Sequence, residues 1–253
     1  MSSVFLPQLR AALRDWWREQ TSSKGVAGAA FLLVRELWGF ALESTPAQRR
    51  QRYGDMDFDW EQHVNTTSGA VSWRTRLLGI FHSPYQPTDP ALFREMMAAL
   101  PIDFREFTFI DIGSGKGRTL LLASEYPFRR IVGVELLIEL HSAAEENVAQ
   151  HRLRLGTVTG GQEAQVIEAL CIDAREFVFP ETPLVVYLFN PLTEAGLRQV
   201  LHNLEQSCRR NPRSVWIVYH NPVLETVLCQ KPTTMKELAG PEYSVFRMNA
   251  DAA

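Results

Sequence analysis

FTFIDIGSGKGRTLLLAS, from Phe107 to Ser124, is the most informative stretch of this chain. Its first part is apolar, β-prone and carries one acid, Asp111. Gly113, Gly115 and Gly117 follow in alternation with other residues, and good helix formers come next. Glycine lets the backbone turn tightly and lie against a ligand that a β-carbon would exclude, and the free N–H groups of a new helix point at the same place. The stretch therefore predicts a strand, a ligand-binding turn and a helix.

The spacing of the glycines separates two kinds of nucleotide ligand. A dinucleotide-binding turn has the pattern G-x-G-x-x-G, and its third glycine would fall where this chain has Arg118. Asp111 stands two residues before the first glycine, where a carboxylate would repel a pyrophosphate. An acid at that place suits a cationic ligand instead. S-adenosylmethionine carries an ammonium, a sulfonium and no phosphate.

The pattern D-x-G-S-G-x-G, from Asp111 through Ser114 to Gly117, resembles motif I of the class I S-adenosylmethionine-dependent methyltransferases. The resemblance implies a Rossmann-like domain with S-adenosylmethionine as its cofactor. It also implies that Asp111 and the loop of residues 113–117 hold the methionine part of that cofactor.

Three later pieces of the chain extend the resemblance, each at the end of an apolar run. RIVGVEL ends near Glu135, which the family would use to accept the ribose hydroxyls; the alternative is a glutamate that caps the helix expected from about Ile138. CIDAREFVFP places Asp173 where the family binds the adenine amino group, and an ordinary turn aspartate is the alternative. PLVVYLFNPL ends in Asn190 and Pro191, which resemble motif IV beside the transferred methyl group or form a plain turn.

The acceptor is read less directly than the cofactor. The amine-modifying members of the family often have a second proline and an aromatic at motif IV, and both are missing after Pro191, which puts an adenine- or cytosine-type acceptor in doubt. The amide oxygen of Asn190 could hold an amine N–H and aim its lone pair. PYQPT resembles an aromatic–x–Pro segment of the class I lysine methyltransferases outside the SET fold, so Tyr85 joins Asn190 as a candidate for positioning the acceptor. The sequence thus favours a protein side-chain nitrogen, lysine-like, over a small-molecule hydroxyl.

Four other polar residues have open readings. His82 and His220 could serve as general bases, because histidine titrates near neutrality, or could be structural. Lys116 and Arg118 flank the loop and are either solvated surface charges or contacts to a substrate or a carboxylate.

Composition is that of an ordinary globular protein: 253 residues, 45% hydrophobic and 22% charged. The formal net charge of −3 gives no electrostatic footprint for nucleic acid, which makes such a partner less favoured.

The three cysteines, Cys171, Cys208 and Cys229, are not in metal-binding spacing, so no metal is expected. Few cysteines, odd in number, favour reduced thiols, and we therefore expect a cytoplasmic location. No targeting segment is recognised. Residues 26–42 are apolar but interrupted by charge, which favours a buried or docking helix over membrane-surface contact and excludes a comfortable span.

The chain is expected to have two parts. Residues 1–88 form a helical N-terminal extension: a first helix, a linker at Thr21–Gly25, a second helix to about Leu42, and an aromatic segment that is either a lid or an ordered covering loop. Residues 89–253 form the methyltransferase domain, an α/β, Rossmann-like, mainly parallel seven-stranded sheet with helices on both faces and an antiparallel end.

Three functions remain open at this point. The preferred one is an S-adenosylmethionine-dependent methyltransferase acting on a protein nitrogen. A small-molecule O- or N-methyltransferase is the second, and the third is a degenerate fold of the same kind that serves as a partner subunit. The sequence does not reveal the acceptor or the oligomeric state.

Overall fold

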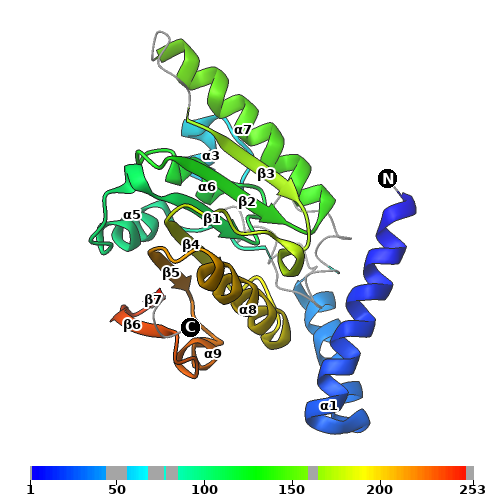
Figure 1. The fold of residues 1–253 in the computed structure, drawn as a ribbon. Coiled ribbons are helices and arrows are strands. Elements are labelled where there is room, and N and C mark those ends of the chain that lie inside the picture. The colour runs from blue at the N-terminus through cyan, green and yellow to red at the C-terminus, as the bar shows by residue number, and fades with distance from the viewer. Residues whose placement is uncertain (1, 44–55, 68–76, 78–84, 159–164, 249–253) are drawn as a thin grey trace. The chain divides into compact units, whose positions relative to one another are not determined.

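The computed structural model describes residues 2–43, 56–67, 77, 85–158 and 165–248. They fall into two compact units (Figure 1). The first unit contains residues 1–60 and 67–87, and the second contains residues 61–66 and 88–253.

The second unit is built on one seven-stranded sheet with the order β3-β2-β1-β4-β5-β7-β6. Strands β1 to β5 are parallel, and β7 runs antiparallel to both β5 and β6. The mainly parallel sheet with an antiparallel end is thereby confirmed. The strands are β1 (Thr108–Ile112), β2 (Arg130–Glu135), β3 (Ile167–Cys171), β4 (Leu184–Phe189), β5 (Val215–His220), β6 (Thr234–Ala239) and β7 (Tyr243–Met248).

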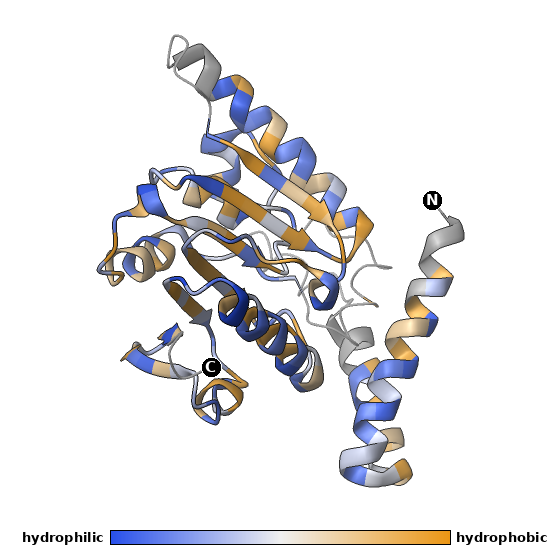
Figure 2. Ribbon diagram, viewed as in Figure 1, coloured by the Kyte–Doolittle hydropathy of each residue, from blue (hydrophilic) through white to orange (hydrophobic). Residues whose placement is uncertain are grey.

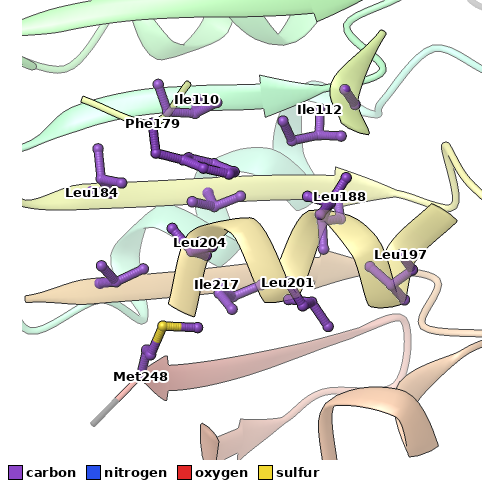
Figure 3. Close-up of a cluster of buried hydrophobic side chains, with 14 of the residues drawn as sticks. Ile110, Ile112, Phe179, Leu184, Leu188, Leu197, Leu201, Leu204, Ile217 and Met248 are labelled. Atoms are coloured by element: carbon purple, nitrogen blue, oxygen red, sulfur yellow. The ribbon is translucent and has the colours of Figure 1, made fainter. Parts of the chain in front are cut away.

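Helices cover both faces of the sheet, as expected. On one face the amphipathic helix α8 presents Leu197, Leu201 and Leu204 to a cluster of side chains from β1, β4, β5 and β7 (Figure 3). Figure 2 shows the polar side of α8 turned away from the orange central strands. The helices of this unit are α5 (Pro90–Ala98), η2 (Phe104–Glu106), α6 (Arg118–Ala123), α7 (Ile138–Val158), η3 (Ala174–Glu176), α8 (Glu194–Arg210) and α9 (Glu225–Cys229).

The opposite face of the sheet is aromatic near its centre. Phe93 of α5 packs edge-on against Phe109 of β1, with ring centroids 5.9 Å apart, and tilts against Tyr187 of β4 at 5.8 Å. Successive residues of a strand point to opposite faces, so Phe109 and Asp111 lie on this side while Ile110 and Ile112 belong to the α8 side. Asp111 therefore lies over the same face as α5 and α6.

The strand order reverses between β1 and β4. From β1 the chain proceeds outward through β2 and β3, and then returns across β1 to continue through β4 and β5. Ligands in open α/β sheets bind beyond the carboxyl ends of the strands at such a switch point. The fold thus brings the glycine turn after β1 and Asn190 after β4 to the same rim.

The first unit contains α1 (Ser2–Glu43), and α3 (Met56–Gln62) begins in it. The predicted linker at Thr21–Gly25 is wrong in extent: the helix runs on to the break at Gly25, whose φ of 72° is left-handed. In the second unit, α7 begins at Ile138, where the sequence places the start of a helix, and ends at Val158.

No helix in the described ranges is both long enough and apolar enough to cross a bilayer.

Candidate functional site

The glycine loop is a tight turn in which three residues have left-handed backbone conformations. Gly113, Gly115 and Gly117 have φ values of 81°, 54° and 81°. The Gly117 N–H donates to the Ser114 carbonyl at 2.8 Å, which closes the turn into α6. A β-carbon on Gly113 would stand 2.3 Å from the Pro191 β-carbon, so the turn after β1 and the turn after β4 touch at this glycine.

Asp111 is a carboxylate buried beneath this loop. It is 2% exposed, and its Oδ2 accepts a hydrogen bond from the Thr119 hydroxyl in α6. Burial raises the pKa of Asp111 to about 7; the Thr119 bond opposes this rise, and the charge of Glu135 adds to it. Among the described residues no basic side chain forms an ion pair with Asp111. A cation bound here would supply the missing counter-charge.

Glu135 ends β2 and is tied to the loop. Its Oε2 accepts from the Gly115 N–H at 2.9 Å and its Oε1 accepts from the Leu137 N–H at 2.7 Å. Burial raises the pKa of Glu135, and these backbone bonds partly offset the effect. The bond from Leu137, just before α7, is the capping contact weighed as an alternative. Each carboxylate oxygen has a second lone pair, so the ribose role stays a prediction beside the cap.

Asn190 sits in a left-handed turn, with a φ of 45°, directly after β4. Its Oδ1 accepts from the Tyr219 hydroxyl at 2.9 Å, and its Nδ2 donates to the Asn221 carbonyl at 2.5 Å. These bonds fix the amide and lock the turn after β4 to the turn after β5. One lone pair of Oδ1 is left for an acceptor N–H, and that role stays a prediction.

A chain of buried hydrogen bonds crosses the sheet beside Asp111. Tyr187, which pairs with Asp111 in the β1–β4 register, is bonded through its hydroxyl to the Thr88 hydroxyl and to His220 Nδ1, both at 2.8 Å. The imidazole of His220 stacks on Phe189 with centroids 3.8 Å apart. Burial lowers the pKa of His220 to about 4, so the ring is neutral near pH 7. Its described contacts are structural, and the base role stays a prediction.

Lys116 and Arg118 are not solvated surface charges, so that reading is wrong. They are 3% and 2% exposed. Lys116 Nζ donates to Asn65 Oδ1 at 3.1 Å, and Arg118 Nε donates to the Thr66 hydroxyl at 2.7 Å. Burial lowers the pKa of Arg118 to about 10, which leaves it charged at neutral pH.

The remaining predicted residues are placed less tightly. Asp173 caps η3 by accepting from the Arg175 N–H at 2.9 Å and pairs with the Arg175 guanidinium at 2.6 Å, the contacts of a turn aspartate; its adenine role stays a prediction. Tyr85 is half-buried and belongs to the first unit, so its role also stays a prediction. His82 lies outside the described residues. In the described part of the chain, no cluster of three or more His, Cys, Asp and Glu side chains could hold a metal.

The site residues fit a cationic nucleoside cofactor by their chemistry. Two buried acids, Asp111 and Glu135, face a loop whose glycines leave room for backbone contact. Burial disfavours both negative charges, and a bound ammonium would favour them. A pyrophosphate would add negative charge to the same place.

Sequence reasoning did not identify several residues that hold this arrangement. Three of them form hydrogen bonds from ordinary helix or strand positions: Thr119 to Asp111, Tyr219 to Asn190, and Asn147 to the loop. Their partners lie elsewhere in the chain. Thr119 alone had a local signal, since the first turn of a helix after a glycine loop faces back toward the strand that precedes the loop.

The sequence matches no family model and no curated protein. Solved structures that match include an RNA methyltransferase from Salinibacter ruber in complex with S-adenosyl-L-homocysteine, at 21% identity over 64% of this chain and 92% of that one, with a TM-score of 0.42. A ribosomal protein L11 methylase from Lactobacillus delbrueckii subsp. bulgaricus is 17% identical over 63% and 75%, with a TM-score of 0.40. A precorrin-6y C5,15-methyltransferase from Geobacter metallireducens GS-15 is 16% identical over 63% and 88%, with a TM-score of 0.46.

These are likenesses of fold, and the acceptors named belong to those proteins. The sheet order, the glycine turn after β1 and the acid that ends β2 are this chain's own features. The order of its seven-stranded sheet gives the chain a Rossmann-like α/β fold.

Proposed function

We propose that this protein is an S-adenosylmethionine-dependent methyltransferase. The observation that carries the proposal is the buried Asp111 carboxyl under the glycine loop, whose pKa is raised to about 7 without a counter-ion among the described residues. S-adenosylmethionine offers an ammonium to such a site, whereas a nicotinamide dinucleotide offers a pyrophosphate. The same acid also stands at the switch point of the sheet, where this fold binds ligands.

The roles of the other residues follow from their places on the rim. The 113–117 loop holds the methionine part with Asp111, Glu135 accepts the ribose hydroxyls, and Asp173 accepts the adenine amino group. The bound cofactor supplies an activated methyl group on a sulfonium. Methyl transfer is an in-line displacement, so the main task of the protein is to orient the acceptor lone pair and to keep water out.

For the acceptor we propose a protein side-chain nitrogen, lysine-like. Asn190 is held rigidly by Tyr219 and Asn221, and the free lone pair of its Oδ1 can take an amine N–H. Tyr85 is the second candidate for positioning. A free lysine titrates near about 10.4, so the amine must lose its proton before it attacks. Burial lowers the pKa of His220 to about 4, so its imidazole would be a weak base for this proton.

Two other functions stay in competition. A small-molecule O- or N-methyltransferase would use the same cofactor site with a different acceptor. A degenerate subunit would bind the cofactor, or nothing, without turnover. The net charge of −3 disfavours a nucleic-acid acceptor. Transfer of a labelled methyl group from S-adenosylmethionine to lysate proteins, small molecules or nucleic acid distinguishes these outcomes, and no transfer to any of them supports the degenerate subunit.

The ribose assignment has its own test in Glu135→Gln. We expect this variant to bind S-adenosylhomocysteine about 10-fold more weakly or worse, because an acceptor of backbone and ribose hydrogen bonds is altered. The 2′-deoxy analogue should bind the wild type more weakly than S-adenosylhomocysteine does, and should show a much smaller difference in the variant. Calorimetric titration measures all four affinities, with Glu168→Gln on β3 as the matched control. An equal loss on removing the hydroxyl in wild type and variant would contradict a ribose role.

A further inference from the structure

A buried asparagine of α7 joins the glycine loop to a distant piece of chain. Asn147 is 2% exposed. Its Nδ2 donates to the Lys116 carbonyl inside the loop at 2.9 Å and to the Asn65 carbonyl at 3.1 Å, while its Oδ1 accepts from the Asn65 N–H at 2.8 Å. A single side chain thus satisfies both backbone groups of residue 65 and one carbonyl of the loop.

The loop peptide that Asn147 holds is fixed at both ends. The carbonyl of the peptide between residues 116 and 117 is bonded to Asn147, and its N–H donates to the Ser114 carbonyl. Gly117 packs against the same helix, since a β-carbon there would lie 3.2 Å from the Ala144 β-carbon. Asn147 and Ala144 are one helical turn apart, so one face of α7 sets the geometry of the loop (Figure 1 shows α7 beside α6).

The segment that Asn147 joins to the glycine loop is residues 61–66. Lys116 and Arg118, from the loop and the first turn of α6, bind the side chains of Asn65 and Thr66. Further along α7, Arg154 donates to the Glu61 carbonyl at 3.1 Å. Residues 61–66 belong to the second unit, whereas the residues that precede and follow them in the sequence belong to the first. The attachment of this segment therefore depends on side chains that also shape the cofactor loop.

We propose that Asn147 is a positioning residue that couples cofactor binding to the attachment of residues 61–66. A ligand that fixes the loop fixes the Lys116 carbonyl, which holds the Asn147 amide in the orientation that binds Asn65. By linkage, the factor by which the cofactor favours the attachment of residues 61–66 is also the factor by which their attachment favours cofactor binding. The inference rests on the proposed cofactor, and it concerns a residue outside every motif that suggested that cofactor.

Hydrogen exchange of the full chain with and without S-adenosylhomocysteine tests the coupling. In the wild type the ligand should slow exchange of the Asn65 and Thr66 amides about 10-fold or more. Asn147→Asp keeps the oxygen that accepts from Asn65 but turns a carboxylate toward two carbonyl oxygens. It should bind the ligand at least about 10-fold more weakly and show no such slowing at equal occupancy.

Asn211→Asp is the matched control, because Asn211 also donates through Nδ2 to a backbone carbonyl, that of Glu181, at 2.9 Å. It should behave as the wild type in both measurements. If the wild type binds S-adenosylhomocysteine without slowing exchange at residues 65 and 66, or if Asn147→Asp retains the slowing, the coupling is wrong while the cofactor stands. If the wild type binds neither S-adenosylmethionine nor S-adenosylhomocysteine, the proposed function fails and the coupling fails with it.

Discussion

Asp111 shows at the scale of one residue how a binding site opposes stability. Burial raises the pKa of Asp111 in the folded state from 3.8 to about 7. The contribution of this carboxyl to the unfolding free energy is therefore complete below pH 3.8 and is lost as the pH rises through about 7. That difference corresponds to at most about 4 kcal/mol of unfolding free energy. A cationic ligand would recover part of it by favouring the ionised carboxylate.

Asp111→Asn removes this titration, and the first prediction follows from the sign. Without ligand, the unfolding free energy of the variant relative to wild type should rise by about 2 kcal/mol from about pH 5.5 to about pH 8.5, because only the wild type must ionise a buried acid. The variant should also bind S-adenosylmethionine more weakly. Denaturant unfolding at several pH values measures the first effect, with the exposed Asp103→Asn as control. A stability difference that does not change with pH would show that Asp111 is already ionised without strain.

Gly113 carries the second prediction at this scale. Gly113→Ala adds a β-carbon where φ is 81° and where Pro191 stands at 2.3 Å, so the two turns must move apart. We expect a loss of about 1–3 kcal/mol in unfolding free energy and weaker binding of S-adenosylhomocysteine. Gly196→Ala is the control, since its β-carbon would meet ordinary contacts from 3.4 Å in the helix α8. Equal effects of the two substitutions would contradict the close approach of the turns.

At the scale of elements, the helix α8 holds one face of the sheet. Leu204 is fully buried among side chains of the cluster in Figure 3. Leu204→Ala should lower the unfolding free energy by about 2–5 kcal/mol through lost contact and a residual cavity. It should leave the affinity for S-adenosylhomocysteine within about 3-fold, because Leu204 faces away from the site. Chemical unfolding and calorimetry check both parts, and a small loss of stability would mean that α8 is not a core helix.

The strands were the most predictable elements, and the reason is local. Apolar runs such as residues 107–112 and 183–189 end at turn residues, so pattern and boundary agree. The sequence wrongly predicts a linker over all of Thr21–Gly25, because serine and threonine usually favour turns. Here Thr21 donates to the Trp17 carbonyl at 2.7 Å and Ser22 to the Glu19 carbonyl at 2.8 Å, so their hydroxyls bond within the helix and only Gly25 breaks it.

The parts of the site that could not be predicted depend on distant partners. The order of Asp111, Glu135 and Asn190 at strand ends was enough to expect them on one rim. Burial of Lys116 and Arg118 depends instead on Asn65 and Thr66, which lie about 50 residues earlier in the chain and carry no motif. Nothing in the local pattern of a charged loop distinguishes a buried amide partner from water.

At the scale of the whole second unit, the sheet should unfold from its antiparallel edge. β4 and β5 are paired on both sides and almost entirely buried, whereas β6 is one of the two edge strands, with β3 the other, and is mostly exposed. Native-state hydrogen exchange should therefore be slowest in β4 and β5 and faster by a factor of about 100 or more in β6. Peptide-level mass spectrometry measures this. Uniform protection across the sheet would show that the edge hairpin is part of the same cooperative unit.

Thermal unfolding of the full chain, with separate additions of S-adenosylmethionine, S-adenosylhomocysteine and NADH, tests whether the protein binds the proposed cofactor. At about 100 times its dissociation constant, a ligand adds about 2.7 kcal/mol to the folded state. We expect a clear rise in the unfolding temperature with both adenosyl ligands and none with NADH. Stabilisation by NADH alone, or by none of the three, would contradict this expectation.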